Sequence, residues 1–382
     1  MAVRLSGNNK ISSVIIITTQ CFAPKIGGIE SLMTGMAEAM SNAGKNVLVL
    51  ADGKKESEDS KQKYKIIRFH GWKPLRRRRK ARYLKKYLKK YEVEAIYADS
   101  WKSVEYLNNI TKKIIALAHG TEIPKKYFDS FYGYFNVKKR RIINSYKNCN
   151  IIAANSTYTR DLMIASLRMS TDKITIIHPG IDVYEDFIQD EDRDSVRSII
   201  GKSNPIISTL ARVEKRKGHK FVINAVAKLK SKFPNMIYLV AGRGPYLEEI
   251  KRYVKSLCLE EYVIFLGWIT EPEKSLVLQN SDVFIMTPST VGESVEGFGM
   301  VFIDAAFHGI ASIGTTSGGI SDAIIDNKTG LLCEEGNQDN ITKNIDILLS
   351  NEKLRNQLGE NGRVRARKEY SWELKVLEYL KL

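Results

Sequence analysis

Short apolar runs and amphipathic stretches alternate along almost the whole chain. The apolar runs indicate strands near residues 13–19, 46–51, 65–69, 94–98, 113–118, 150–154 and 173–177, and then near 205–210, 236–241, 262–266, 282–286 and 311–314. Stretches with helical spacing lie near 29–43, 76–91, 101–109, 124–147, 156–168, 220–232 and 301–308. Because strands that alternate with helices form parallel sheets covered by helices, the pattern predicts an α/β fold with two sheets.

A polar, acidic segment separates the two sets of strands. It contains the cluster 190–194 and ends where Pro205 opens the next strand. We therefore expect a first domain over 1–186, a linker over 187–204, a second domain over 205–364 and a terminal helix over 365–382, which a chain of 382 residues is long enough to form. A metal site in the linker is not favoured, because its carboxylates follow no strand.

Composition narrows the class of protein. With 43% hydrophobic and 27% charged residues the chain is globular, which excludes a disordered, fibrous or small disulfide-rich protein. The apolar runs are shorter than the roughly 18–20 residues of a membrane-spanning helix, and the first 20 residues do not resemble a signal peptide. The cysteines lack metal-ligand spacing. We expect reduced thiols, no metal or cofactor, and a cytoplasmic location.

Positive charge is concentrated in the first part of the chain. The formal net charge is +17, and residues 1–149 carry 31 Lys and Arg against 12 Asp and Glu. A field of one sign on one domain predicts an anionic partner, which is a nucleic acid, an acidic membrane surface or a charged substrate.

Within this part, the stretch 76–91 combines a stripe of tyrosine and leucine with a dense row of cations. This pattern predicts a helix that lies on an anionic membrane and approaches the acceptor, through Arg76, Arg77, Arg78, Arg79, Lys80, Arg82, Tyr83, Lys85, Lys86 and Tyr87. Alternatively, the stripe packs on the sheet while the cations are solvated, and the two interpretations are compatible. A second basic and aromatic cluster covers 125–141.

Glycine-rich and cationic turns follow strands of the second half. The turn from Arg212 to Gly218 places cations beside a helix start, which predicts an anion site, although a merely solvated basic turn has the same composition. Farther along, Glu296 precedes a turn that leads into a helix carrying Asp304. Ionised carboxylates accept hydrogen bonds, so they suit the hydroxyl groups of a sugar or ribose.

In this order the motifs resemble those of glycosyltransferase family 4. The resemblance covers nearly the whole chain and is strongest over 205–335. It rests on Gly27-Gly28-Ile29-Glu30, His119-Gly120-Thr121-Glu122, His178-Pro179-Gly180-Ile181-Asp182, Arg212 with Lys217-Gly218, Gly242-Arg243-Gly244-Pro245, Phe265-Leu266-Gly267, Pro288-Ser289, Glu296-Gly297-Phe298-Gly299, Gly318-Gly319 and Thr329-Gly330.

The resemblance implies a retaining nucleotide-sugar glycosyltransferase with the GT-B fold. In that fold two Rossmann-like domains with parallel sheets face each other across a cleft, and a C-terminal helix packs back on the first domain. The implied catalytic residues are His119, Arg212, Lys217 and Glu296. The implied donor-binding residues are Gly27, Gly28, Arg212, Lys217, Gly242, Gly267, Glu296, Gly297, Phe298, Gly299 and Asp304.

Each role follows from the family. Arg212 and Lys217 would hold the donor diphosphate, Glu296 would bind the donor sugar, and His119 would line the cleft near the reacting carbon. The residue at 304 would hold the ribose hydroxyls, but the family usually has Glu where this chain has Asp304. A second departure is Ser321-Asp322, where family members often have Pro-Glu.

The sequence thus predicts an enzyme that transfers a hexose-type sugar to a lipid or lipid-linked glycan at the inner face of the cytoplasmic membrane. A UDP-sugar donor is favoured and a GDP-sugar is possible. The alternatives are a soluble acceptor, an epimerase or phosphorylase on the same fold, and a nucleic-acid-binding protein that uses the basic first domain. The last alternative leaves the motifs of the second half unexplained. The identity of the sugar, the acceptor, the linkage and the oligomeric state are left open.

Overall fold

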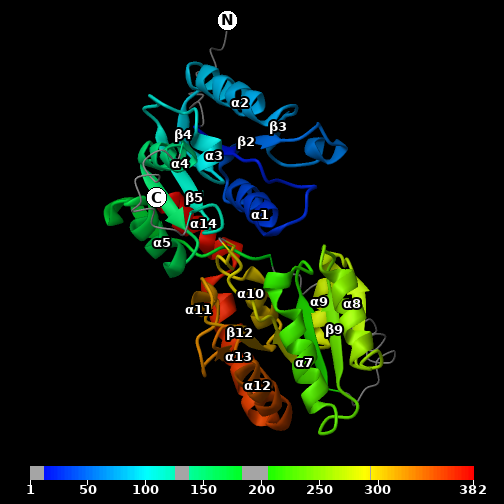
Figure 1. Ribbon diagram of the computed structural model, residues 1–382. Helices are drawn as coiled ribbons and strands as arrows, with labels where there is room; N and C mark the ends of the chain where they lie inside the picture. Colours follow the sequence, from blue (N-terminus) through cyan, green and yellow to red (C-terminus); the bar gives the residue numbers. More distant parts are fainter. Residues whose placement is uncertain (1–12, 125–136, 183–204, 293) are drawn as a thin grey trace, which may run out of the picture.

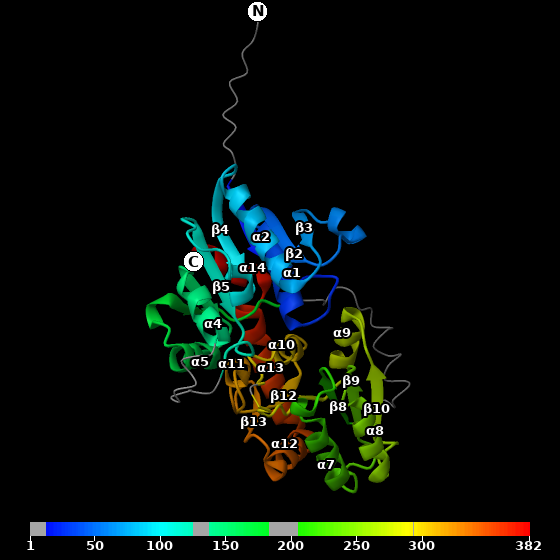
Figure 2. The ribbon, with the colours of Figure 1, turned by 45° about the horizontal axis from the view of Figure 1, so that its top comes forward.

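The computed structural model describes residues 13–124, 137–182, 205–292 and 294–382, and contains two parallel sheets (Figures 1 and 2). The predicted linker and most of the cluster at 125–141 lie outside these residues. The first sheet has the order β3-β2-β1-β4-β5-β6-β7. Its strands are β1 (Val14–Thr18), β2 (Asn46–Asp52), β3 (Lys65–Phe69), β4 (Val93–Ala98), β5 (Lys113–Ala118), β6 (Ile151–Ala154) and β7 (Ile174–Ile176).

Helices cover both faces of this sheet. They are α1 (Gly28–Asn42), α2 (Lys73–Leu88), α3 (Trp101–Val104), α4 (Val137–Lys147) and α5 (Thr157–Leu167), with short 3₁₀ turns at Ser57–Ser60 and Thr171–Lys173. Strand β1 shows why both faces need cover, because all five of its residues are buried. Ile16 belongs to the core on one face, whereas Ile15 and Ile17 belong to the core on the other, as the two-residue period of a strand requires.

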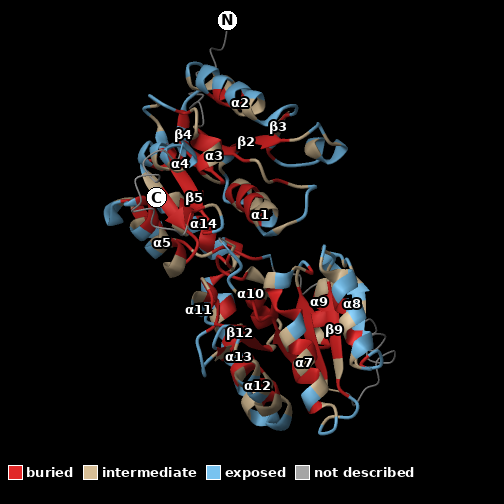
Figure 3. Ribbon diagram, in the orientation of Figure 1, coloured by how far each residue is buried: buried red, intermediate tan, exposed pale blue. Residues whose placement is uncertain are grey.

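The second sheet has the order β10-β9-β8-β11-β12-β13. Its strands are β8 (Ile206–Leu210), β9 (Ile237–Ala241), β10 (Val263–Gly267), β11 (Val283–Ile285), β12 (Ala311–Thr315) and β13 (Gly330–Cys333). The other elements of this part are a 3₁₀ turn at Lys215–Lys217 and α7 (His219–Leu229), α8 (Leu247–Ser256), α9 (Glu271–Gln279), α10 (Met300–Phe307), α11 (Ile320–Ala323), α12 (Gln338–Ser350) and α13 (Glu352–Glu369). Buried residues fill the central strands of both sheets (Figure 3).

The chain ends in α14 (Trp372–Lys381), which packs on the first domain. Trp372 lies so close to α1 that a Cβ added at Gly35 would be 2.3 Å from the indole nitrogen. The Tyr97 hydroxyl of β4 donates a hydrogen bond to the carbonyl oxygen of Tyr379 at 2.7 Å. The predicted α/β fold with two Rossmann-like domains and a returning C-terminal helix is therefore confirmed.

Several element boundaries differ from the prediction. Strand β13 was not predicted, because its run is short and starts at a glycine. Helix α3 ends at Val104 instead of near residue 109, and α2 starts earlier than expected, with Pro74 in its first turn. The predicted boundary at 364/365 falls inside α13. Helix α14 starts at Trp372, as the run Ser371-Trp372-Glu373 indicates, and Ser371 occupies its N-cap position without a side-chain capping hydrogen bond.

Parallel register brings the carboxyl ends of the strands to one edge of each sheet. In the first sheet Thr18 pairs with Leu50 and Ala98, and in the second sheet Leu210 pairs with Ala241. The loops that leave these edges carry the predicted site residues. Ligands bind at this edge in open parallel sheets, so the fold directs attention to the loops.

Candidate active site

The strongest polar cluster in the second domain joins Glu296 to two cations. The carboxylate oxygen Oε2 of Glu296 lies 2.5 Å from Nζ of Lys217 and 3.0 Å from Nη1 of Arg216. Burial alone would raise the pKa of Glu296, but Lys217 and Arg216 together hold it below its ordinary value. The structure therefore brings the predicted Lys217 and Glu296 together as a charged pair.

Backbone geometry fixes this cluster at the start of α7. Gly218 has a φ of +79°, and a Cβ at this position would lie 2.0 Å from the carbonyl oxygen of Thr287. Only glycine fits this combination of left-handed backbone and close approach. The tight turn after Lys217 thereby holds the ammonium against the loop that follows β11.

Arg212 and Arg216 come from the same turn but lie differently relative to Glu296. The Arg212 side chain is 74% exposed and pairs with Glu214 at 3.1 Å, so it is not part of the Glu296 cluster. Arg216, whose contact was not predicted, is the arginine that pairs with Glu296, and it also contacts Glu214. The sequence contained a signal, the run of cations over 215–217, but a run does not tell which cation points inward.

Two glycines hold the neighbouring loops together. A Cβ at Gly242, which has a φ of +142°, would lie 1.9 Å from the carbonyl oxygen of Ala211. The Gly242 N–H donates a hydrogen bond of 2.6 Å to the carbonyl oxygen of Gly267. The loops after β8, β9 and β10 therefore form one continuous edge.

The two domains meet at the carboxyl edges of their sheets. Ser156, the N-cap of α5, donates a hydrogen bond of 2.7 Å to the carbonyl oxygen of Gly297. A Cβ at Gly297 would lie 2.0 Å from the carbonyl oxygen of His119. The buried His119 ring places Nε2 2.8 Å from the carbonyl oxygen of Asp99. His119 and the predicted loop Gly297–Gly299 thus lie side by side, although they come from different domains.

The turn before α1 also reaches the second domain. Gly27 is the N-cap of α1, and a Cβ at Gly28 would lie 3.8 Å from the sulfur of Met300, the first residue of α10. Gly299, with a φ of +88°, is the N-cap of α10. The structure therefore places the predicted Gly27-Gly28 turn next to the predicted Phe298-Gly299 turn.

A second contact between the domains involves Asp322, a position where the chain departs from the family motif. The Asp322 carboxylate accepts a hydrogen bond of 2.7 Å from the backbone N–H of Thr157, and Nε2 of His178 lies 3.1 Å from the same oxygen. Burial alone would raise the pKa of Asp322, but these partners hold it below its ordinary value. The His178 ring also stacks on Phe298, with centroids 5.2 Å apart. Asp322 thus connects the second domain to the start of α5.

Asp304 lies on α10 and pairs with a cation that was not predicted. Its Oδ2 is 3.3 Å from Nζ of Lys274, and the same ammonium is 2.5 Å from Glu271. Asp304 and Glu296 therefore belong to two separate charged clusters.

The cations predicted on α2 fall into two groups: some are buried or paired with acidic side chains, and the others are exposed. Tyr83, Leu84, Tyr87 and Leu88 pack against the core of the first sheet, which is the alternative interpretation of the stripe. Lys80 is only 2% exposed, 3.0 Å from Asp52 and 2.7 Å from the carbonyl oxygen of Thr19. The assignment of Lys80 to a membrane-facing surface is therefore wrong, because the side chain points into the protein.

Two more cations of α2 are held by acidic side chains. Arg76 pairs with Asp52 at 2.8 Å and Arg77 pairs with Glu105 at 3.1 Å. The exposed members of the predicted set are Arg78, Arg79, Arg82, Lys85 and Lys86. Just before and within the first turn, Trp72 is 71% exposed and Leu75 is 52% exposed, and neither was singled out from the sequence.

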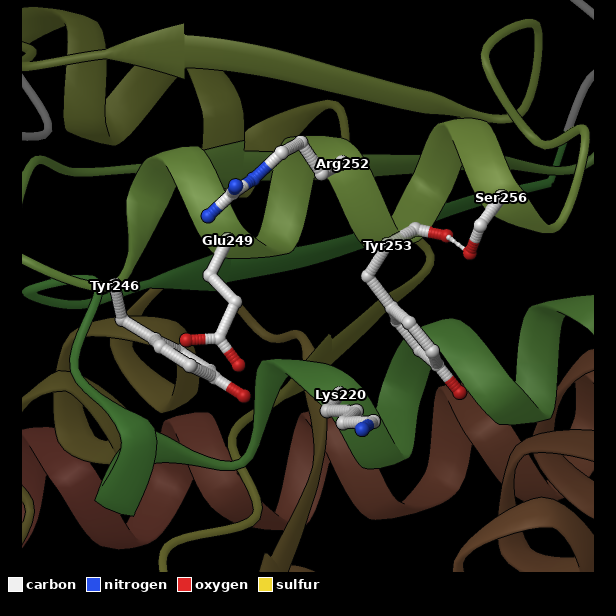
Figure 4. Close-up of a pocket in the computed structure, with 6 residues that line it drawn as sticks. All are labelled: Lys220, Tyr246, Glu249, Arg252, Tyr253 and Ser256. Atoms are coloured by element: carbon white, nitrogen blue, oxygen red, sulfur yellow. Dashed lines mark hydrogen bonds between the residues drawn. The ribbon is translucent and has the colours of Figure 1, made fainter.

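A separate hollow of about 340 Å³ lies between α7 and α8. Its lining is polar and aromatic, with the ammonium of Lys220 4.4 Å from the ring centre of Tyr253. Figure 4 shows the lining side chains Lys220, Tyr246, Glu249, Arg252, Tyr253 and Ser256. None of the predicted site residues contributes to it.

Over the residues that the structure describes, no group of three or more His, Cys, Asp or Glu side chains is arranged to hold a metal ion. Within the same residues, no helix is long and apolar enough to cross a membrane.

The geometry favours a ligand that combines negative charge with hydroxyl groups. Lys217, Arg216 and the N-termini of α7 and α10 attract anions, whereas the carboxylates of Glu296 and Asp304 accept hydrogen bonds from hydroxyls. A nucleotide-sugar has both features, and the cluster lies beside the junction with the first domain.

Comparisons with known proteins agree with this fold. The family model "Glycosyltransferase Family 4" matches residues 26–185, and "Glycosyl transferases group 1" matches residues 190–365. The chain is 26% identical over 372 residues to the GDP-mannose-dependent alpha-(1-6)-phosphatidylinositol monomannoside mannosyltransferase of Mycolicibacterium smegmatis, covering 94% of this chain and 95% of the relative.

Two further similarities are informative. Mannosylfructose-phosphate synthase of Agrobacterium fabrum is 25% identical over 263 residues, which cover 66% of this chain and 57% of the relative. The crystal structure of Anabaena HepE in complex with UDP superimposes with a TM-score of 0.79 at 17% identity, covering 96% of this chain and 98% of that structure.

Two Rossmann-like domains joined at their carboxyl edges, with a returning C-terminal helix, are the features of the GT-B fold. The chain belongs to glycosyltransferase family 4, as its motifs indicated.

Proposed function

We propose that this protein is a retaining glycosyltransferase that moves a hexose-type sugar from a nucleoside diphosphate sugar to a lipid or lipid-linked glycan at a membrane surface. The observation that carries the proposal is the cluster of Lys217, Arg216 and Glu296 at the carboxyl edge of the second sheet, beside the junction with the first domain. The cluster supplies both the charge that a diphosphate needs and an acceptor for sugar hydroxyls.

In this proposal the cations stabilise the leaving group. When the bond from the anomeric carbon to the diphosphate breaks, negative charge develops on the phosphate oxygens. Arg212, Lys217 and Arg216 stabilise that charge, and preorganised charges of this kind supply much of an enzyme's rate acceleration. The departing phosphate accepts the proton of the attacking hydroxyl, so transfer on the same face of the sugar needs no protein nucleophile and no metal.

Glu296 has two partners before the donor binds and new ones afterwards. In the structure both of its cationic neighbours contact Oε2. A diphosphate competes for the same cations, and the freed carboxylate then accepts hydrogen bonds from the sugar hydroxyls. Binding of the donor is thereby coupled to the formation of its own sugar site.

For the donor, the Mycolicibacterium relative supports GDP-mannose, because its name specifies that donor and the similarity covers nearly both chains. The sequence motifs favoured a UDP-sugar, and UDP is the ligand in the HepE structure. GDP-mannose is therefore the first donor to test and UDP-glucose the second.

For the acceptor, two observations support a lipid. The name of the same relative includes a phosphatidylinositol mannoside. In this chain α2 presents Arg78, Arg79 and Arg82 to solvent, close in sequence to the exposed Trp72 and Leu75. Cations with exposed apolar side chains suit an anionic lipid interface. The proposed location is peripheral, at the inner face of the cytoplasmic membrane.

Donor turnover tests the proposal through three arginine variants. Release of GDP from GDP-mannose, and of UDP from UDP-glucose, is measured with phosphatidylinositol-containing vesicles and without added metal. Arg212→Ala and Arg216→Ala should each lower kcat/KM by about tenfold or more, because each removes a charge-assisted hydrogen bond to the diphosphate.

The matched control is Arg252→Ala, which removes an exposed arginine of α8 outside the cluster and should leave turnover unchanged. Normal turnover in both Arg212→Ala and Arg216→Ala would contradict the donor site. Transfer to a soluble sugar phosphate in place of lipid would support the donor site but reject the lipid acceptor, in favour of an acceptor like that named for the Agrobacterium relative.

A further inference from the structure

The ammonium of Lys274 is shared between two carboxylates at the edge of the second sheet. Its Nζ lies 2.5 Å from Glu271 on the same helix, α9, and 3.3 Å from Asp304 on α10. The side chains of Lys274 and Asp304 are only 20% and 13% exposed. Lys274 therefore connects α9 to α10 at this edge through a largely buried ion pair.

The charges around this ion pair are unbalanced. Asp182, which follows β7, interacts electrostatically with Glu271, Asp304 and Lys274, and also with Glu38 of α1. Lys274 thus lies in a cluster with four carboxylates, which come from α1, α9, α10 and the segment after β7. Without its ammonium, the like charges would repel each other and favour proton uptake.

Burial shifts the pKa values of Asp304 and Lys274 in opposite directions. Burial raises the pKa of Asp304, and Lys274 partly offsets that rise. Burial lowers the pKa of Lys274, but Asp304 and Glu271 more than compensate and keep it above its ordinary value. At neutral pH the lysine is therefore charged, and it is the neighbour that favours the ionised form of Asp304.

Asp304 occupies the position at which the family resemblance places the ribose hydroxyls of the donor. An ionised carboxylate accepts hydrogen bonds from two hydroxyls at once, whereas a protonated one has lost part of that capacity. Asp is also one methylene shorter than Glu, so its oxygens have a smaller range of positions from which to reach a ligand. Both effects make the charge and orientation of this carboxylate decisive for binding.

We propose that Lys274 is a positioning residue for the donor nucleotide: it keeps the short Asp304 carboxylate ionised and fixed, so that the carboxylate accepts hydrogen bonds from the ribose hydroxyls. This inference rests on the proposed function. It makes the preference for a ribose with both hydroxyls depend on a lysine that does not itself contact the reacting atoms.

Calorimetric titration of the full-length protein tests the proposal with four ligands: GDP, UDP, 2′,3′-dideoxy-GDP and inorganic pyrophosphate. Wild type should bind GDP about tenfold or more tightly than dideoxy-GDP, the difference expected for hydrogen bonds to a charged group. In Lys274→Met this preference should fall below about threefold at pH 7. Pyrophosphate, which has no ribose, should bind both proteins within about threefold.

The pH dependence separates positioning from structural damage. In Lys274→Met the pKa of Asp304 is no longer lowered by the ammonium, so Asp304 binds a proton at higher pH than in wild type. The preference for GDP over dideoxy-GDP should therefore be lost at a higher pH in Lys274→Met than in wild type, and it should grow as the pH is raised. Lys274→Arg, which retains the charge, should behave like wild type throughout.

Each contrary result has a separate meaning. If wild type binds GDP or UDP but does not distinguish GDP from dideoxy-GDP, the role of Lys274 is overturned while the donor site stands. The same conclusion follows if Lys274→Met retains the wild-type preference, or if the two proteins lose the preference at the same pH. If wild type binds neither nucleoside diphosphate, the proposed function fails, and this inference fails with it.

Discussion

At the scale of the residue, the proposed donor site depends on the directions of side chains, which sequence motifs do not show. Arg212 and Arg216 lie four positions apart in one cationic turn, yet only the second contacts Glu296. The turn itself could be predicted, because cations and glycine after a buried strand are readable as a pattern. The direction of each side chain could not, because it depends on the loop after β11 that packs against the turn.

Gly218 provides a test of this packing. Replacement by Ala introduces a Cβ 2.0 Å from the carbonyl oxygen of Thr287, in addition to the strain of a φ of +79°. The strain costs about 1–2 kcal/mol, and the forced displacement adds about 1–3 kcal/mol. Denaturant unfolding should therefore show a lower free energy of unfolding by several kcal/mol.

The matched control for this substitution is Gly44→Ala. Gly44 has the same φ of +79°, but a Cβ there would meet no atom within 4 Å. Gly44→Ala should show the cost of the strain alone. Equal losses in the two variants would mean that the contact with Thr287 does not constrain the turn.

At the scale of the element, α2 shows how far a periodic pattern can be trusted. Its stripe of tyrosine and leucine correctly predicted a helix with one apolar face, and that face packs on the first sheet. Helical spacing places Lys80 on the face of this stripe, because it precedes Tyr83 and Leu84 by three and four positions, but a lysine is expected to be exposed. Asp52 and the carbonyl oxygen of Thr19, both distant in sequence, make its burial possible.

The exposed cations of α2 lead to a prediction about membrane binding. Replacing Arg78, Arg79 and Arg82 together by Ala should weaken binding to vesicles containing anionic lipid by ~10- to ~100-fold at low salt, since each nearby cation contributes about 1 kcal/mol. Wild-type binding should also fall as salt is added. Co-sedimentation with vesicles measures both effects.

The control for this experiment is a matched set of three cations on α8 in the second domain, Lys251, Arg252 and Lys255, which are also exposed. Their replacement by Ala removes the same charge and should leave vesicle binding almost unchanged. If the two triple variants bind equally weakly, net charge and not the surface of α2 determines the interaction.

At the scale of the whole molecule, contacts between the domains were the least predictable part of the structure. The contacts that join the domains are isolated hydrogen bonds and ring contacts, made by Ser156, His178 and Asp322. Such pairs are far apart in the chain, so no local pattern indicates them. The resemblance to the family predicted that the two domains face each other, but it marked residue 322 only as a departure.

Asp322→Asn tests this junction. The substitution keeps the shape but removes the charge that attracts the N–H of Thr157 and the ring of His178, which should lower the free energy of unfolding by about 1–3 kcal/mol at pH 7. The pKa of Asp322 is lowered in the folded protein, so its contribution is present above the ordinary aspartate pKa and is lost as the pH falls through the folded value. Denaturation of both proteins from pH 7 to pH 3 measures the difference.

The difference between wild type and Asp322→Asn should therefore shrink below about pH 4. A difference that stays constant over the whole range would assign the effect of the substitution to packing instead of charge.

The first domain cannot finish folding until α14 has been synthesised. Trp372, Val376 and Tyr379 belong to the core on the α1 face of the first sheet, yet they follow every other residue of both cores in the sequence. The core of the second domain, by contrast, is complete once Tyr370 has been made. A chain that stops before residue 372 therefore contains every core residue of the second domain but leaves the α1 face of the first domain uncovered.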